Sequence, residues 1–251
     1  MKDEKSMITS AKNEKIKALR KLHKKKERTE TGTFLVEGNH LVEEAWKSNW
    51  TILEVIAQEG VELPKWCEEI QVSFVTEQVF QHVSQTKSPQ GIAAVVKIKE
   101  AMVDLDNHLL LIDAIQDPGN LGTMIRTADA AGFGGIILGS GTVDLYNDKV
   151  VRSTQGSLFH IPIKAAPLDT EIEQLKQNGY TIWATALQNA HNFSETNRNS
   201  KVALILGNEG AGVQRVLQEE ADNVVKIPIY GEAESLNVSI AAGILMYYIK
   251  G

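Results

Sequence analysis

The chain has 251 residues, of which 43% are hydrophobic and 23% charged, so it can bury a full core as one large domain or two modest ones. Its single cysteine excludes a disulfide framework and a cysteine-based metal site, and it is typical of a reducing compartment. No apolar run reaches the ~18 residues of a membrane span, and the charged N-terminus lacks the apolar core of a signal peptide. We therefore expect a cytoplasmic protein with no membrane partner.

The net charge of −6 is distributed unevenly along the chain. Residues 1–30 hold eleven lysines and arginines against five acidic residues, a local charge of +6, which leaves −12 for the remainder. Taken alone, such a run favours a solvated helix face, which is the usual place of clustered charge. The alternative is a basic stripe that neutralises phosphate, because nucleic-acid binding needs a basic surface and not a basic protein.

The first hundred residues predict a small α/β unit. Ser10 is a suitable N-cap for a helix that continues to about Lys26. After it, strand-like runs at 34–37, 52–57, 72–75 and 92–97 alternate with helix-like runs at 40–47, 64–69 and 77–83. This alternation predicts a sheet with helices packed on it.

A second α/β unit follows a break in the pattern. We assign residues 1–100 to the first domain, 101–107 to a linker and 108–251 to the second domain. The run at 109–112 is apolar without alternation, as in parallel strands covered on both faces. Further strands are expected at 135–138, 181–185, 202–206 and 223–227. The last helix, ending near Lys250, is apolar nearly all round, which predicts burial on every side in a core, a subunit interface or both.

Three glycine-bearing segments lie where these strand runs end: DPGNLGTMIRTADAAG at 117–132, LGNEGAGV at 206–213 and IPIYGEAESLNVS at 227–239. Ligands bind at such positions in open α/β sheets. Asn120 is well placed to cap the helix of the first segment. The second segment lacks both the lysine of a phosphate-binding P-loop and the glycine spacing of a dinucleotide site. Its Glu209 is unfavourable beside phosphates and favourable beside a cation, which favours a cationic cofactor.

Together the three segments resemble the signature motifs of the SpoU (TrmH-like) branch of the SPOUT superfamily, which are S-adenosylmethionine-dependent RNA ribose 2′-O-methyltransferases. The first motif of that branch reads Asn-x-Gly-x-x-x-Arg-Thr, and Asn120, Gly122, Arg126 and Thr127 meet each fixed position. More loosely, residues 32–45 and 88–91 resemble the N-terminal substrate-binding domain of rRNA enzymes of this branch. The alternative for these residues is ordinary turns that bound strands.

The resemblance implies an α/β fold in which a small RNA-binding domain precedes a SPOUT domain with a mostly parallel sheet. It also implies a C-terminal trefoil knot and a homodimer formed through the catalytic domain. S-adenosylmethionine is the implied cofactor, held mainly by backbone groups. The residues implied at the cofactor site are Leu206, Gly207, Gly212, Ile227, Ile229, Ser235 and Leu236.

Arg126 is the residue to which the resemblance gives the central role. It either activates the ribose 2′-hydroxyl or, in a milder version, anchors the phosphate beside it. The residues that would orient the substrate around it are Asn120, Glu209, Asn237 and Ser239. The structural alternative is that Arg126 pairs with a carboxylate such as Asp129. No metal site is predicted, because the histidines are scattered without ligand spacing.

The resemblance favours 23S ribosomal RNA as the substrate. The alternatives are a tRNA ribose methyltransferase and an RNA-binding protein without catalysis, and the latter would require a broken motif. With RNA as the substrate, the basic N-terminal run is predicted to contact phosphates. Its candidate contact residues are Lys21, Lys24, Lys25 and Arg28.

Overall fold

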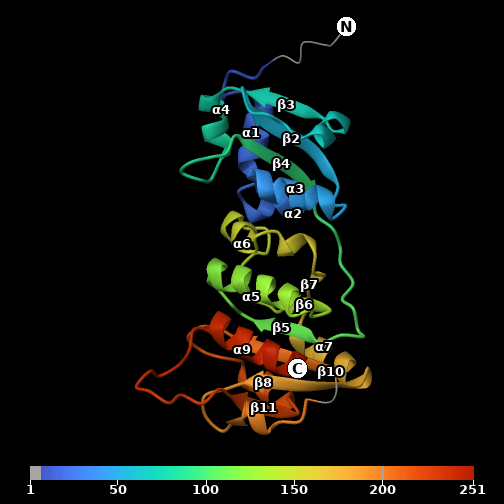
Figure 1. Ribbon diagram of the computed structural model, residues 1–251, viewed down its shortest axis with the longest axis vertical. Coiled ribbons are helices and arrows are strands. Elements are labelled where there is room, and N and C mark those ends of the chain that lie inside the picture. Colours follow the sequence, from blue (N-terminus) through green and yellow to red (C-terminus); the bar gives the residue numbers. More distant parts are fainter. Residues whose placement is uncertain (1–6, 199–200) are drawn as a thin grey trace. The chain divides into compact units, whose positions relative to one another are not determined.

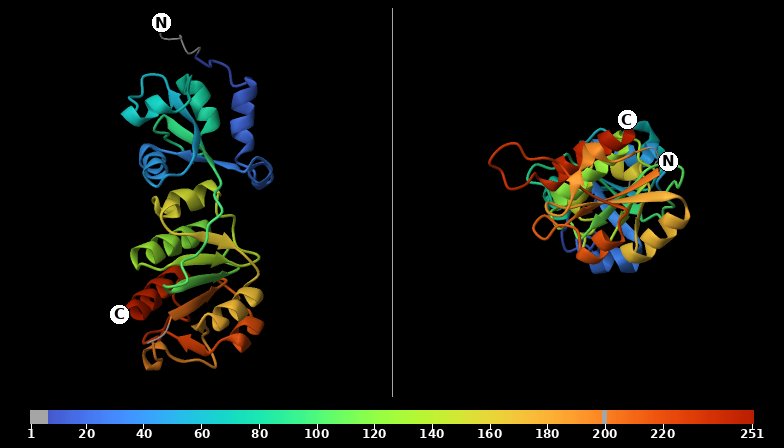
Figure 2. Two further views of the ribbon diagram at one scale, coloured as in Figure 1. Left: turned by 90° about the vertical axis from the view of Figure 1, so that its right-hand side faces the viewer. Right: turned by 90° about the horizontal axis from the view of Figure 1, so that it is seen from below.

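The computed structural model describes residues 7–198 and 201–251, which form two compact units (Figures 1 and 2). The first unit comprises Met1–Lys99 together with Asp144–Phe159, and the second comprises Glu100–Val143 and His160–Gly251. Residues 98–108 contain no helix or strand. The segment Asp144–Phe159 therefore packs with the first unit although its neighbours in sequence belong to the second, and no pattern in the sequence indicated this.

The first unit is built on a four-stranded sheet in the order β1-β4-β2-β3. Strand β4 (Ile92–Lys97) is antiparallel to β1 (Thr33–Glu37) and β2 (Ile52–Gln58), whereas β2 is parallel to β3 (Val72–Val75). Helices α1 (Glu14–Lys21) and α4 (Glu77–Val83) bury Ile16, Leu19 and Phe80 against one face. The remaining elements of this unit are α3 (Asn39–Lys47), the 3-10 turns η1 (Lys65–Glu69) and η2 (Ser157–Phe159), and α6 (Asp148–Ser153).

The basic N-terminal segment forms two helices, so the prediction of one helix from Ser10 to Lys26 is wrong. Asn13, and not Ser10, caps α1 by accepting a hydrogen bond from the Lys15 amide at 2.9 Å. The chain turns after α1, and α2 (Lys25–Thr31) ends at the left-handed Gly32. The turn allows both Leu22 and Arg28 to be buried, which one straight helix through these residues does not provide.

The basic side chains of this segment differ in exposure. Lys21, Lys24 and Lys25 are exposed. Arg28 is only 5% exposed, donates to the Leu22 carbonyl at 2.7 Å and forms an ion pair with Asp144. The prediction that Arg28 contacts RNA is therefore wrong, because its guanidinium is committed inside the unit. Lys2 and Lys5, which contribute to the charge of residues 1–30, lie outside the described residues.

The second unit contains a seven-stranded sheet in the order β7-β6-β5-β10-β8-β11-β9. Every pairing in it is parallel, which confirms the predicted mostly parallel sheet. The strands are β5 (Leu109–Asp113), β6 (Gly135–Leu138), β7 (Ile163–Ala165), β8 (Tyr180–Thr185), β9 (His191–Asn192), β10 (Lys201–Gly207) and β11 (Asn223–Lys226). All five residues of β5 are buried, as expected for a strand covered on both faces.

Helices cover both faces of this sheet. On one face α7 (Leu168–Gln177) and α8 (Arg215–Glu220) pack against a cluster that includes Leu109 and Leu111. On the other face α5 (Pro118–Ala130) and α9 (Val238–Lys250) lie side by side (Figures 1 and 2). A short turn, η3 (Phe193–Glu195), follows β9. Across the described residues, no helix has the length and apolar character needed to cross a membrane.

Helix α9 is only partly covered within one chain. Leu245, Met246 and Ile249 are buried on the side that packs toward α5 and β10. Ile240 and Tyr247 remain 55% and 57% exposed. The prediction that α9 is buried on every side therefore does not hold for the chain by itself.

Candidate active site

The start of α5 places the first motif. Asp117 is the N-cap, and its Oδ1 accepts a hydrogen bond from the Asn120 amide at 2.8 Å, with Pro118 as the first helical residue. The prediction that Asn120 caps this helix is therefore wrong, because Asp117 already fills that position. Asn120 lies in the first turn, where its side-chain amide reaches the other two motifs.

The Glu209 carboxylate is fixed at the end of β5. It accepts hydrogen bonds from the Gln116 amide at 3.2 Å, the Asp117 amide at 3.0 Å and Asn120 Nδ2 at 3.1 Å. Burial acts to raise the pKa of Glu209, but these hydrogen bonds outweigh it and hold the pKa below its ordinary value. Glu209 is therefore a carboxylate at neutral pH that joins the second motif to the first.

The glycine-bearing loop after β10 closes on itself. Asn208 and Gly212 exchange backbone hydrogen bonds at 3.1 and 2.9 Å, and Asn208 Oδ1 accepts from the Gly210 and Ala211 amides. A Cβ at Gly207 would lie 2.1 Å from the Gly212 carbonyl carbon, so no larger residue fits in this loop conformation. Sequence reasoning missed the organising role of Asn208.

Asn237 joins the third motif to the first. Its Oδ1 accepts from the Ser239 amide at 2.9 Å and the Ser239 hydroxyl at 2.7 Å, and its Nδ2 donates to Asn120 Oδ1 at 3.0 Å. Ser239 is 9% exposed. A continuous chain of hydrogen bonds therefore runs from Glu209 through Asn120 and Asn237 to Ser239, and it links all three motifs.

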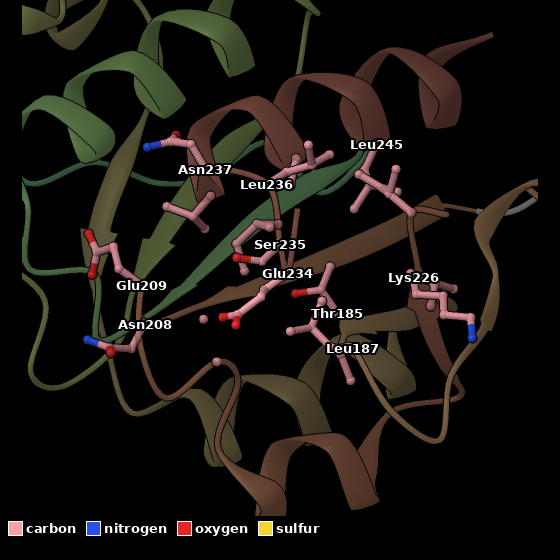
Figure 3. A pocket seen from close by; sticks show the side chains of 18 of the residues that line it. Thr185, Leu187, Asn208, Glu209, Lys226, Glu234, Ser235, Leu236, Asn237 and Leu245 are labelled. Carbon is pink, nitrogen blue, oxygen red and sulfur yellow. The ribbon is translucent and has the colours of Figure 1, made fainter. Parts of the chain in front are cut away.

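A cavity of about 620 Å³ opens at the carboxyl ends of β8, β10 and β11 (Figure 3). All of the predicted cofactor residues line it: Leu206, Gly207, Gly212, Ile227, Ile229, Ser235 and Leu236. Glu209 and Asn237 also line it, whereas Asn120, Arg126 and Ser239 do not. The structure thus brings the second and third motifs to one cavity and places the first motif beside it through hydrogen bonds.

Arg126 lies on an exposed part of α5. Within residues 7–198 and 201–251 its guanidinium makes no ion pair and no side-chain hydrogen bond. Asp129, the alternative partner considered from the sequence, instead lies 3.0 Å from His160 Nδ1. The guanidinium of Arg126 is therefore available to a ligand.

Further side chains line the cavity and were missed by sequence reasoning, among them Thr185, Leu187, Lys226 and Glu234. Figure 3 shows the Glu234 side chain extending into the cavity. In the part of the chain that the structure describes, its carboxylate has no hydrogen bond or ion pair. Its place next to Ser235 in the third segment was a signal that could have identified it.

Comparison with known families gives two matches. Residues 107–247 match the model of the SpoU rRNA Methylase family, and residues 13–94 match an MRM3-like substrate binding domain. The chain belongs to the SpoU rRNA methylase family. A relative from Bacillus subtilis (strain 168), the 23S rRNA (guanosine(2553)-2′-O)-methyltransferase RlmP, is 49% identical over 97% of this chain and 99% of its own.

Solved structures of this family cover nearly the whole chain. The AdoMet-bound rRNA methyltransferase from Sinorhizobium meliloti has a TM-score of 0.88 and 33% identity, over 98% of this chain and 97% of its own. The SpoU methyltransferase AviRb from Streptomyces viridochromogenes, in complex with the cofactor AdoMet, has a TM-score of 0.85 and 27% identity, over 95% and 97% of the two chains. Family and fold therefore agree over both units.

Proposed function

We propose that the chain transfers a methyl group from S-adenosylmethionine to the ribose 2′-hydroxyl of a guanosine in 23S rRNA. The Bacillus subtilis relative is named for this reaction at guanosine 2553. The observation that carries the proposal is geometric: two of the three loops line one cavity and the third lies beside it, and the hydrogen bonds from Glu209 to Ser239 join all three. The first motif keeps each of its fixed residues, Asn120, Gly122, Arg126 and Thr127.

The cavity fits S-adenosylmethionine in size and lining. Its volume of about 620 Å³ lies within the roughly 300–1,000 Å³ of small-molecule sites. Leu187 and Leu245 supply apolar wall, and the absence of a side chain at Gly207 lets the loop after β10 close against Gly212 and Val213. Glu234 supplies a carboxylate, which favours a cationic ligand. When bound, S-adenosylmethionine would supply a methyl group on a sulfonium that a ribose oxygen could attack in line, with S-adenosylhomocysteine as the leaving group and the hydroxyl proton passing to solvent.

The protein's part in the reaction is alignment. A hydroxyl that is held in line with its reaction partner reacts far faster than a free one. The entropy cost of aligning the two groups is met when they bind, so it no longer adds to the barrier of the reaction. The exposed Arg126 guanidinium presents a fork of donors that suits a phosphate. Because a guanidinium keeps its proton to about pH 12 or beyond, we assign Arg126 to anchoring the phosphate next to the target ribose. Asn120, Asn237 and Ser239 orient the nucleotide beside it.

Methylation of isolated RNA tests the proposal. The protein is incubated with tritiated S-adenosylmethionine and 23S rRNA from a Bacillus subtilis strain that lacks the relative, with wild-type rRNA and bulk tRNA as controls. We expect incorporation only into the unmethylated rRNA, with ribose methylation mapped to guanosine 2553. Incorporation into tRNA, or none into any of these RNAs, contradicts the proposal.

We also propose that the enzyme is a homodimer formed through the catalytic domain. The support is the apolar stripe on α9, where Ile240, Ile244 and Tyr247 are 55%, 38% and 57% exposed at helical spacing. A second copy of the chain would cover this stripe. Light scattering should give twice the chain mass of 27.6 kDa at micromolar concentration, and Ile244→Glu should shift it to the monomer. A wild-type monomer contradicts the proposal.

Two further features implied by the resemblance stay predictions. One is the C-terminal trefoil knot of the second domain. The other is the cytoplasmic location.

A further inference from the structure

The first unit has a cavity of its own, with a volume of about 220 Å³. Three segments that are far apart in sequence form its wall: the corner between β1 and α3, the loop before β4, and the end of α6 with the turn after it. Its polar side chains include Glu37, His40, Ser88, Gln90, Arg152 and Gln155. The residues matched to the substrate-binding domain model end at residue 94, so Arg152 and Gln155 lie outside that match.

The segment that carries Arg152 and Gln155 is firmly attached within this unit. At its start, Asp144 pairs with the buried Arg28. At its end, Trp50 Nε1 donates to the Phe159 carbonyl at 3.1 Å. Between them the ring of Tyr146 lies 4.5 Å from that of Phe34. The position of the α6 wall within the first unit is therefore fixed by contacts on both sides of it.

Two unusual backbone conformations shape the cavity. Gln155 has a φ of 51°, a left-handed conformation that is uncommon outside glycine and that clusters at ligand sites. Its carbonyl lies 3.1 Å from His40 Nε2, so the turn positions the His40 ring. Gly38 has a φ of 100°, and a Cβ there would lie 3.2 Å from Gln90 Oε1. Gln90 accepts a hydrogen bond from the Asn39 amide at 2.8 Å through the same oxygen.

The wall retains hydrogen-bonding capacity that the chain does not use. Arg152 donates from Nη1 to Asp148 at 2.8 Å, and its remaining guanidinium donors have no partner among the described residues. The Gln90 amide nitrogen and the Ser88 hydroxyl are equally without partners in the described part of the chain. Glu37, in contrast, accepts from Ser84, Thr86 and the Gln85 amide.

We infer that this cavity binds one unpaired nucleotide of the substrate RNA, with Arg152 on its phosphate and Gln90, Ser88 and His40 on its base edge. The inference rests on the proposed function, which makes RNA the substrate. Unpaired bases expose edges of mixed donors and acceptors, which amide side chains read. A guanidinium fork suits phosphate. The volume of about 220 Å³ is below the range of drug-sized ligands, roughly 300–1,000 Å³, and suits a single base.

RNA affinity of the full chain tests the inference. The probe is an in vitro transcript of the 23S rRNA region around the proposed target, and binding is followed by fluorescence anisotropy over a range of salt concentrations. Arg152→Gln removes the phosphate contact. Gln90→Glu keeps the oxygen that accepts from Asn39 but removes the free donors. The Arg152–Asp148 pair is one turn apart and 33% and 29% exposed, so its loss should not prevent folding.

Matched controls separate the cavity from general surface charge. Lys87→Gln removes one positive charge from the loop before β4 at a residue outside the cavity wall, and Gln81→Glu adds one negative charge on the exposed side of α4. We expect Arg152→Gln and Gln90→Glu each to weaken RNA binding about tenfold, the first because a hydrogen bond to a charged phosphate is strong, the second because acceptors of the base edge lose their donor and face a carboxylate. The controls should change it less than about threefold. Melting temperature and affinity for S-adenosylhomocysteine should not change.

If the cavity variants and their controls lose the same amount of RNA affinity, the inference is overturned. That result would show that RNA affinity depends on the charge of the surface and not on the cavity. Unchanged RNA affinity in Arg152→Gln overturns it as well. The wild-type methylation assay reports on the proposed function separately. RNA binding with the expected contrasts, but without methyl transfer, would contradict the proposed function and leave the nucleotide site in place.

Discussion

The two cavities of the molecule are built from different parts of the chain. The cavity in the second unit lies at the ends of parallel strands, and the glycine-bearing loop after β10 forms part of its wall. The cavity in the first unit is walled mainly by polar side chains from three separate segments. A substitution that forces this loop open should disturb the whole wall, whereas the replacement of one polar side chain in the first-unit cavity should remove only the contacts of that side chain. The cavity of the second unit should therefore be most sensitive at Gly207, where a Cβ has no room.

The largest expected effect is at Gly207. A Cβ there would lie 2.1 Å from main-chain atoms of Gly212 and Val213, so Gly207→Val must open the loop that closes the cavity. We expect binding of S-adenosylhomocysteine to fall below detection by calorimetry, with the protein still folded by circular dichroism. Gly231→Val is the control, because a Cβ there would meet no atom within 4 Å and Gly231 does not line the cavity. Normal affinity in Gly207→Val would show that the loop backbone does not hold the cofactor.

Arg126 should show the second largest effect, and on rate instead of affinity. It does not line the cofactor cavity, so Arg126→Ala should leave the affinity for S-adenosylhomocysteine unchanged. Methyl transfer should fall at least about 100-fold, because a misplaced substrate loses the benefit of alignment. Arg126→Lys, which keeps the charge but loses the fork, should retain part of the activity. Arg215→Ala is the control, since Arg215 pairs with Glu219 on the exposed α8. Similar rates for Arg126→Ala and Arg215→Ala would remove Arg126 from the mechanism.

The contrast between the cavities explains how far the sequence could predict this molecule. The runs at 109–112 and 202–206 are continuous and apolar, as parallel strands are when helices cover both faces of the sheet. The sequence therefore predicts a buried strand at each position, and β5 and β10 confirm both. The residues predicted to hold the cofactor follow strand ends, and parallel strands bring their carboxyl ends to one edge of the sheet. Each of the predicted residues from Leu206 to Leu236 accordingly lines one cavity.

Features that depend on contacts between distant segments were not predictable in the same way. Arg28 belongs to a basic run, and only its pairing with Asp144, more than a hundred residues away, shows that it is buried. Asp117 and Asn120 are both good N-caps, and the sequence does not say which one is used. In the wall of the first-unit cavity, Gln90 lies beside Gly38 and Gln155 lies beside His40. These residues are far apart in the sequence, so no local pattern predicts that they meet.

Glu234 is a charged side chain in the wall of the second-unit cavity, and its carboxylate would attract a positively charged ligand. S-adenosylmethionine carries one more positive charge than S-adenosylhomocysteine. Opposite charges about 4 Å apart attract by about 1 kcal/mol in water, so Glu234→Gln should weaken binding of the methylated cofactor about fivefold and that of the product less. Glu232→Gln, an exposed neighbour outside the cavity wall, should change neither. Equal losses for both ligands would show that Glu234 does not face the sulfonium.

The smallest expected effect is in the basic segment of the first unit. Single exposed lysines there would add affinity for RNA without recognising its sequence. Lys24→Gln should weaken RNA binding about two- to threefold, since one exposed charge contributes little. The log–log salt slope should fall by roughly 0.7 to 0.9, because one phosphate fewer is neutralised. Lys17 lies on the preceding helix and pairs with Glu14 at 2.7 Å, so Lys17→Gln is the matched control and should change the slope less. If both substitutions leave affinity and slope at wild-type values, this segment is a solvated face. RNA anchoring would then fall to Arg126 and the side chains of the first-unit cavity.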